Sequence, residues 1–224
     1  MNTRPFFLMC VLACINGHAF SAEPDMVSCP QVQVGDMYEQ VRRNGAESKS
    51  SFTISAVSSD TIEATTQSGV TVLWDKSFNV IKAADGRTFS PKFQQVPDCP
   101  FKLGDKKTYP PVSFPGNSAG SMITGRSPVI TVDDRYGTTK IPAGEFKTIR
   151  VISVVNYTRE RTGRSASGRI TRTSYVTPDG IIVRMVNEDQ DFSYGSTNTF
   201  SLEMISLPKN TRGTDGVDRR TNLP

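Results

Sequence analysis

The sequence predicts an all-β protein whose antiparallel meanders form a curved half-barrel or barrel-like sheet built from two related lobes. Three observations lead to this prediction. Short runs of alternating apolar and polar residues recur along the chain, turn signals separate them at intervals of about 8 to 12 residues, and almost no stretch has the period of a helix. β-Branched and aromatic residues are common in these runs, as they are in strands generally.

The first half of the chain predicts short strands joined by tight turns. Asn44-Gly45, after "YEQVRR", is a strong hairpin signal. The run "SFTISAV" places Phe52, Ile54 and Ala56 on one face of a strand. The runs "TIEATT", "VTVLWD" and "FNVIKAADG" follow, and the last of them ends in an Asp-Gly turn. We therefore expect consecutive hairpins in this half.

The second half predicts longer strands after one irregular segment. That segment, "YPPVSFPGNSAGSMITGRSP", is rich in Pro, Gly and Ser and predicts a loop. The strand-like runs are "FKTIRVISVVNYTRE", "GRITRTSYV", "GIIVRMV" and "TFSLEMISL". Alternation in the last two runs predicts two apolar faces, made of Ile181, Val183 and Met185, and of Phe200, Leu202 and Met204.

One phrase occurs twice, as "VSCPQVQVGDMYE" and as "VPDCPFKLGDKKTY". Each copy begins at Cys-Pro and reaches Gly-Asp, which we interpret as the turn that opens a meander. The two lobes then cover residues 29–95 and 99–207 and share one core. Cys29 and Cys99 are the only cysteines left after export, and we expect them to form a disulfide in an oxidising compartment.

Residues 1–21 predict a secretory signal peptide. Arg4 precedes a short apolar run and small residues follow it, so cleavage is expected after Ser21, with Ala22 as the near alternative. The apolar run is too short to span a bilayer, which takes about 20 residues. A second interpretation stays open, because Val-Leu-Ala-Cys at residues 11–14 resembles a bacterial lipobox, in which Cys14 is lipidated.

The mature chain is expected to be a single β domain over residues 22–207. A tail over residues 208–224 lacks any apolar period and is expected to be disordered. Export places the protein in the periplasm or at the outer membrane of a bacterium, or outside the cell, with membrane attachment only if the N-terminus is lipidated. Its 26 basic and 22 acidic side chains are a mild imbalance, which argues against a nucleic-acid partner.

No catalytic residue is expected. Ser118 stands in a literal G-x-S-x-G at residues 116–120, but no helical pattern follows this motif. The single histidine, His18, leaves with the signal peptide, so a serine nucleophile lacks its usual base. A Ser-Lys pair is the catalytic arrangement that composition leaves open.

No metal or other cofactor is expected either. Two cysteines without histidine do not complete a zinc site, which takes four ligands. The acidic stretch "NEDQD", which carries Glu188, Asp189 and Asp191, lacks the Asp-x-Asp-x-Asp-Gly arrangement of a calcium loop. We interpret it as a solvated turn.

An arginine-rich hairpin is the candidate interaction surface. Gly163 and Gly168 suggest its turn, and five arginines surround a single glutamate: Arg159, Arg161, Arg164, Arg169 and Arg172. The guanidinium groups are suited to phosphate or carboxylate groups of a lipid or an acidic partner. The alternative is a charged face that prevents edge-to-edge aggregation of strands.

Four aromatic residues are candidates for lining an apolar cavity: Trp74, Phe78, Phe146 and Tyr157. Aromatic side chains on strands also fill cores, and alternation predicts an inward face without showing whether the interior is hollow. Both interpretations stay open at this point.

Several phrases together resemble a known class of proteins: "LGDKKTY", "IPAGEFKTIRV", "YVTPDGIIVRM" and "LEMISL". They resemble exported bacterial β-rich domains of unknown function and, in overall plan, the lipoprotein-carrier proteins with half-barrel folds. This resemblance implies a concave sheet that shelters acyl chains. Residues 142–144 and 178–180 are expected to be tight turns, with Phe146 entering the next strand inward.

These observations favour a non-enzymatic envelope protein that binds a lipidic or other apolar ligand, or a protein partner, on a β-scaffold. The alternative is a structural or assembly-interface protein with a filled core. A serine hydrolase that uses Ser118 is the third interpretation.

Overall fold

The computed structural model describes residues 25–115, 121–161 and 164–208, apart from the side chain of residue 161. Within these ranges the protein is all-β, with antiparallel pairing between strands. None of the described residues belongs to a helix of the length and hydropathy needed to cross a membrane. The predicted signal peptide, Cys14, His18, Ser118 and the predicted tail lie outside the described residues.

Six consecutive strands form the first meander, in which each strand pairs with the next. They are β2 (Met37–Asn44), β3 (Ala46–Val57), β4 (Thr61–Thr66), β5 (Thr71–Asp75), β6 (Val80–Lys82) and β7 (Thr88–Phe93). The hairpin predicted at Asn44-Gly45 is confirmed, because Asn44 pairs with Ala46 and Gly45 has a positive φ of 72°.

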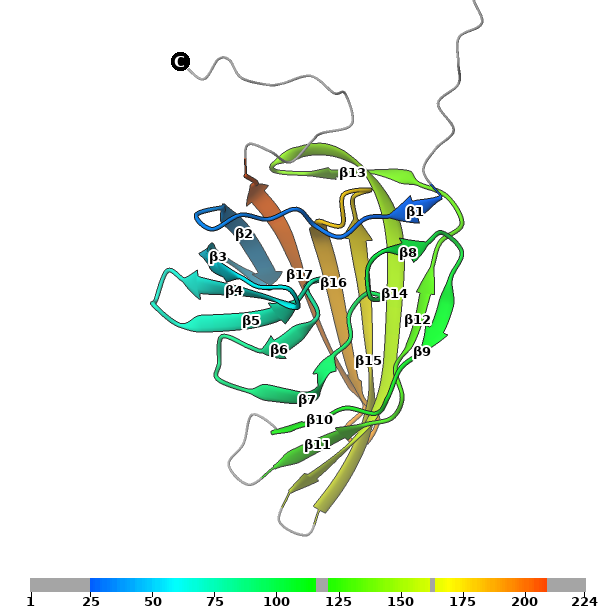
Figure 1. Cartoon of the computed structure of the whole chain (residues 1–224). Coiled ribbons are helices and arrows are strands. Elements are labelled where there is room, and N and C mark those ends of the chain that lie inside the picture. Colours follow the sequence, from blue (N-terminus) through cyan, green and yellow to red (C-terminus); the bar gives the residue numbers. More distant parts are fainter. Residues whose placement is uncertain (1–24, 116–120, 162–163, 209–224) are drawn as a thin grey trace, which may run out of the picture.

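Four long strands form the opposite wall of the molecule (Figure 1). They are β14 (Gly144–Arg161), β15 (Arg164–Val176), β16 (Ile182–Asp191) and β17 (Ser196–Ser206). The expected turn at residues 142–144 joins β13 (Gly137–Ile141) to β14, and the turn before β16 has Gly180 at a φ of 81°. Strand β17 pairs with β2, so the two meanders form one sheet.

Two short strands close this sheet into a barrel. β10 (Ser113–Pro115) pairs with β7, β11 (Met122–Gly125) pairs with β10, and β11 also pairs with β14. The closed ring contains twelve strands in the order β11, β10, β7, β6, β5, β4, β3, β2, β17, β16, β15 and β14. The loop predicted for this segment is therefore wrong in part. Strands of three and four residues are too short to show alternation among Pro and Gly residues.

The remaining strands lie outside the closed ring. β14 has 18 residues and pairs along one edge with three strands in succession, first β13, then β12 (Val129–Val132), then β11. β9 (Lys106–Thr108) pairs with β12, and β1 (Met26–Val27) pairs with β8 (Phe101–Lys102) as a separate two-stranded sheet.

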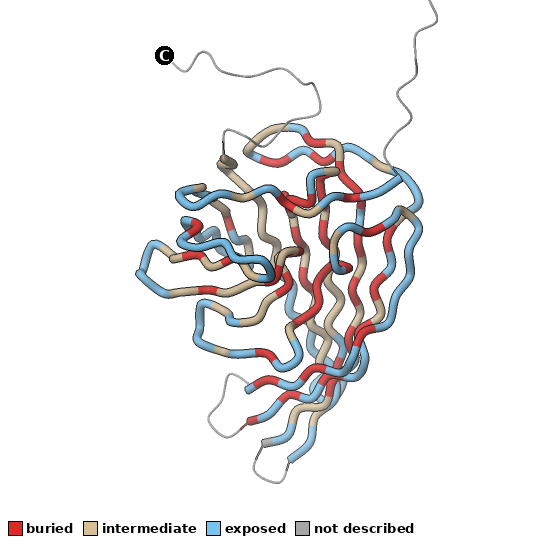
Figure 2. Tube along the Cα trace, in the orientation of Figure 1, coloured by how far each residue is buried: buried red, intermediate tan, exposed pale blue. Residues whose placement is uncertain are grey.

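Buried residues alternate with exposed or intermediate ones along the long strands (Figure 2). The predicted inward face of β16 and its preceding turn is confirmed, because Ile181, Val183 and Met185 are all buried. Ala56 does not share the face of Phe52 and Ile54 as predicted. A register shift between Ile54 and Ala56 turns the end of β3, and Ala56 is exposed.

The repeated phrase forms the same turn twice. The Asp36 carboxylate accepts a hydrogen bond from the backbone N–H of Gln33 at 2.8 Å, and the Asp105 carboxylate accepts one from Lys102 at 3.2 Å. The preceding glycines have positive φ values of 93° and 76°. In both turns the aspartate carbonyl then accepts a backbone hydrogen bond, from residues 54 and 132 respectively.

The predicted disulfide between Cys29 and Cys99 is confirmed, with a Cα–Cα separation of 5.0 Å and 70 residues between its ends. It ties the segment before the first turn to the segment before the second. Disulfides of this kind are typical of proteins outside the cytoplasm.

Candidate ligand-binding cavity

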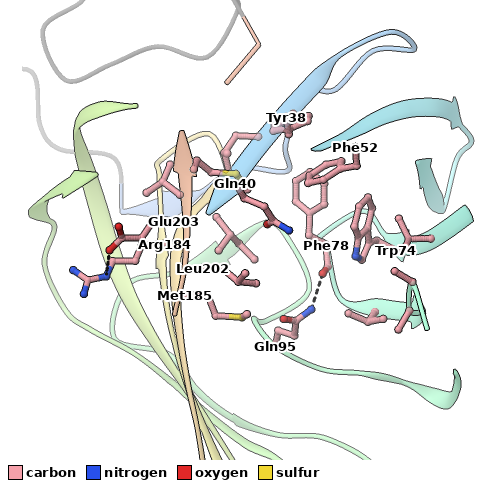
Figure 3. Close-up of a pocket in the computed structure, with 18 of the residues that line it drawn as sticks. Tyr38, Gln40, Phe52, Trp74, Phe78, Gln95, Arg184, Met185, Leu202 and Glu203 are labelled. Carbon is pink, nitrogen blue, oxygen red and sulfur yellow. Dashed lines mark hydrogen bonds and ion pairs between the residues drawn. The ribbon is translucent and has the colours of Figure 1, made fainter. Parts of the chain in front are cut away.

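A cavity of about 310 Å³ lies between the first meander and strands β16 and β17. Its lining is mostly apolar, and side chains from the two walls face each other across it (Figure 3). The first meander contributes Tyr38, Phe52, Val72, Trp74, Phe78 and Val80, and the long strands and the turn before β16 contribute Ile181, Val183, Met185, Leu202 and Met204. Such a lining suits an apolar ligand.

The aromatic wall follows from strand register. Tyr38 and Phe52 are directly paired across β2 and β3, and their rings stack at 5.0 Å between centroids. Trp74 contacts Phe52 edge-on at 5.2 Å, and Phe78 contacts Trp74 edge-on at 5.6 Å. Burial raises the pKa of Tyr38, so its hydroxyl stays neutral at physiological pH. The wall is thus a continuous set of rings without charge.

Of the four aromatic residues predicted as cavity candidates, two line the cavity, namely Trp74 and Phe78. Phe146 is buried in the same cluster as the cavity residues Tyr38 and Val183 but does not itself line the cavity. Tyr157 is buried in a second cluster with Phe93 and Phe114. The barrel interior is therefore filled around Phe146 and Tyr157 and hollow beside Trp74 and Phe78.

A buried polar network holds Phe78 in the wall. Phe78 has a positive φ of 60°, unusual for a residue with a side chain, in the turn between β5 and β6. The Asp75 carboxylate stabilises this turn by accepting backbone hydrogen bonds from Ser77 and Asn79, both at 2.8 Å. The Asn79 side chain in turn accepts the backbone N–H of Gln95 at 2.7 Å.

This network also positions a buried connection that follows β7. Residues 93–97 are all buried although 94–97 belong to no strand. Gln95 Nε2 donates a hydrogen bond to the Phe78 carbonyl at 3.1 Å (Figure 3). The carbonyl of Gln94 accepts a hydrogen bond from the Ser153 hydroxyl at 3.2 Å, which ties the connection to the long-strand wall. Gln95 is thereby fixed with its amide oxygen free for another donor.

That donor is Arg172, which lines the cavity from β15. Arg172 Nη1 donates to Gln95 Oε1 at 2.7 Å, and Nε and Nη2 donate to Asn187 Oδ1 at 3.2 and 3.0 Å. The guanidinium also lies over the ring of Phe93, 4.8 Å from its centroid. Burial lowers the pKa of Arg172 to about 10, and the group is charged at physiological pH.

The structure separates Arg172 from the other four predicted arginines. Arg172 pairs in register with Ser153 on the inward face, whereas Arg169 lies on the opposite face and donates to Asn156 Oδ1 at 3.1 Å. Arg159 lies 3.8 Å from the Asp191 carboxylate. The backbones of residues 161 and 164 pair at the end of the hairpin. A role of these four arginines in binding anionic groups stays a prediction.

Two further features of this region differ from the predictions. Gly168 lies within β15, opposite Tyr157, and not in a turn. Glu188, Asp189 and Asp191 lie within β16 and not in a solvated turn, and Asp189 accepts a hydrogen bond from the Tyr157 hydroxyl at 2.8 Å. Burial, and next this hydrogen bond, raise the pKa of Tyr157. In the part of the chain that the structure describes, no three Cys, Asp or Glu side chains gather as a metal site.

Sequence reasoning missed Arg172 as a cavity residue because charged residues are usually assigned to surfaces. A signal for it was present in the alternation of β15. Arg172 is separated from Ile170 and Val176 by an even number of positions, so it points to the same, inward side of that strand. Asn187 had the same signal, because it lies on the face of β16 that carries Val183 and Met185. Gln95 had none, since it lies outside any strand.

Three solved structures are similar to this chain. The first is a protein assigned as a lipoprotein in Parabacteroides distasonis, with 13% identity and a TM-score of 0.38, and the match covers 81% of this chain and 99% of that one. The second is the hypothetical lipoprotein YmcC from Escherichia coli, with 10% identity and a TM-score of 0.42, covering 75% of this chain and 83% of that one. The third is a protein assigned as exported, with a YmcC-like fold, from Bacteroides fragilis, with 12% identity and a TM-score of 0.36, covering 82% of this chain and 100% of that one. No protein-family model and no curated protein sequence matches the chain.

Proposed function

We propose that this protein is a non-enzymatic, exported binding protein that holds one apolar chain of a lipidic ligand in its barrel cavity. The observation that carries this proposal is the cavity itself, an apolar space between an aromatic wall and an aliphatic wall. Binding sites for small molecules are typically concave, mostly apolar and supplied with a few polar groups. The disulfide supports the exported location.

The cavity volume suits a single chain. A water molecule occupies about 30 Å³ of liquid, and a methylene group takes roughly the same volume. A cavity of about 310 Å³ therefore accommodates about ten such groups. This size matches a medium-length acyl or alkyl chain.

Trp74 provides a direct test, because it is the single tryptophan of the chain and it lines the cavity. A bromine atom quenches indole fluorescence only at close range, so 10-bromodecan-1-ol reports occupancy of this site. We expect saturable quenching of Trp74 that unbrominated decan-1-ol reverses by competition. Quenching that rises linearly without saturation contradicts the proposal.

A blocking variant sharpens the test. Ala83 lines the cavity and is partly buried, so Ala83→Phe places a ring in the space that the ligand needs. We expect this variant to fold and to lose saturable quenching. Ala46→Phe is the matched control, since Ala46 is exposed at the start of β3 and does not line the cavity. Equal binding by both variants places the ligand elsewhere and rejects the proposed site.

A further inference from the structure

We propose that the ligand is an amphipathic acid whose carboxylate or phosphate group binds Arg172 inside the barrel. This inference rests on the proposed function and adds the chemical class of the ligand. It starts from Arg172, which lines a mostly apolar cavity and packs on the ring of Phe93. The other charged residues of the lining are Lys82, which is exposed, and the ion pair of Arg184 with Glu203. Buried guanidinium groups are normally matched by an anion.

The protein supplies Arg172 with neutral acceptors alone, within the ranges that the structure describes. Its three hydrogen bonds go to the amide oxygens of Gln95 and Asn187. Of the five N–H groups of a guanidinium, two therefore have no acceptor among the described residues, one on each terminal nitrogen. Paired N–H groups of this kind are suited to the two oxygens of a carboxylate or phosphate.

Two acidic side chains on the neighbouring strands are engaged elsewhere. Asp189, two residues from Asn187 on the same face of β16, accepts the Tyr157 hydroxyl. Glu203, on β17, forms ion pairs with Arg184 and Arg43, and Figure 3 shows the Arg184–Glu203 pair directed away from Met185 and Leu202. Among the described residues, Arg172 forms no ion pair with either carboxylate.

The arrangement fixes the guanidinium in advance of binding. Asn187 is buried, and Gln95 is held through its backbone by Asn79 and through its side chain by the Phe78 carbonyl. Arg172 is therefore oriented from two sides, and an incoming anion does not have to order it. An apolar chain extending from that anion meets the surfaces of Phe78 and Trp74, which line the same cavity.

The test compares three probes of equal chain length on the oxidised, exported protein at pH 7. They are 10-bromodecanoate, 10-bromodecyl phosphate and neutral 10-bromodecan-1-ol, each titrated against Trp74 fluorescence. We expect at least one of the two anions to bind about 10- to 100-fold more tightly than the alcohol, the range of a charged hydrogen-bonded pair. The tighter of the two anions identifies the head group.

Arg172→Met keeps a long apolar side chain and removes the charge. We expect it to bring the dissociation constants of the anions to that of the alcohol, while the alcohol binds as before. Arg169→Met, on the outward face of the same strand, should leave all three constants unchanged. Urea unfolding of the unliganded variants checks that each one folds, because Arg172→Met leaves the amide oxygens of Gln95 and Asn187 without this donor.

Each remaining outcome decides between the two proposals. Equal binding of anions and alcohol by the wild-type protein overturns the inference about Arg172 and leaves the cavity function intact. An Arg172→Met variant that weakens anions and alcohol equally shows a purely structural role for Arg172 and also overturns it. Failure of all three probes to quench Trp74 rejects the cavity function itself. The wild-type comparison does not depend on the folding of any variant.

Discussion

The ring of Tyr157 lies against Gly168, its direct partner across β14 and β15, in the buried cluster that contains Phe93 and Phe114. A Cβ atom added at position 168 would lie 2.5 Å from Cζ of Tyr157, a separation that real contacts do not show. The absence of a side chain at Gly168 thus lets Tyr157 cross the strand and reach Asp189.

Gly168→Ala should therefore destabilise the protein by about 1 to 3 kcal/mol through overpacking, as measured by urea unfolding. The backbone carbonyl of Gln190 is equally close to the added atom, so a shift of the tyrosine ring alone does not relieve the clash. Gly137→Ala is the control, because a Cβ there meets no atom within 4 Å. Equal unfolding midpoints for the two variants would show that the Tyr157–Gly168 contact is loosely packed.

The disulfide should supply a large part of the stability of the fold. Replacing Cys29 and Cys99 together by alanine opens a loop of 70 residues, and the chain-entropy model gives a loss of about 4 kcal/mol. Reduction of the wild-type protein should cause a loss of similar size. Reductant should not change the stability of the double variant, which is the internal control. A wild-type protein whose unfolding midpoint is insensitive to reduction would contradict this prediction.

Stability should depend on pH through Lys92, which lies 2.5 Å from Asp75 and 2.6 Å from Asp98. Burial lowers the pKa of Lys92, but its hydrogen bonds to Asp75 and Asp98 outweigh burial and raise it above the usual 10.5. Burial likewise raises the pKa of Asp98, and the hydrogen bond from Lys92 outweighs it, leaving that pKa below 3.8. Stability from Asp98 is thus present above pH 3.8 and lost as the pH falls through its lowered pKa.

The lysine contribution has the opposite sign. It is present below pH 10.5 and lost as the pH rises through the raised pKa of Lys92. We expect Lys92→Met to lose less stability than the wild type between pH 7 and pH 3, by up to about 1 kcal/mol because the Asp98 pair is partly exposed. Lys102→Met, at an exposed position, is the control. The same slope of unfolding free energy with pH in all three proteins would refute the coupling.

Alternation predicted the inward residues wherever a strand was long and regular. Ile181, Val183 and Met185 were found in this way, and so were the cavity residues Leu202 and Met204. Turn chemistry was equally informative, since a hairpin at Asn44-Gly45 needs little beyond local sequence.

The features that sequence reasoning missed depend on contacts between distant segments. Strands β10 and β11 exist because β7 and β14 offer edges to pair with, and nothing within three or four residues records that. The displacement of Ala56 comes from a bulge, which alternation cannot anticipate. Arg172 owes its role to Gln95, which is 77 residues away in the chain.

Asn79 joins the stability of the fold to the shape of the cavity. Its side chain is fully buried, accepts the backbone N–H groups of Gln95 and Val96, and donates to Asp75 at 3.0 Å. Asn79→Ala leaves two buried N–H groups without an acceptor, and we expect a loss of about 2 to 5 kcal/mol in urea unfolding. Asn198→Ala, at an exposed position of β17, should change stability little. Since Asn79 also positions Phe78 and Gln95, the variant should bind 10-bromodecan-1-ol more weakly under conditions where it is still folded. A folded Asn79→Ala protein with unchanged Trp74 quenching would show that the cavity keeps its shape without this network.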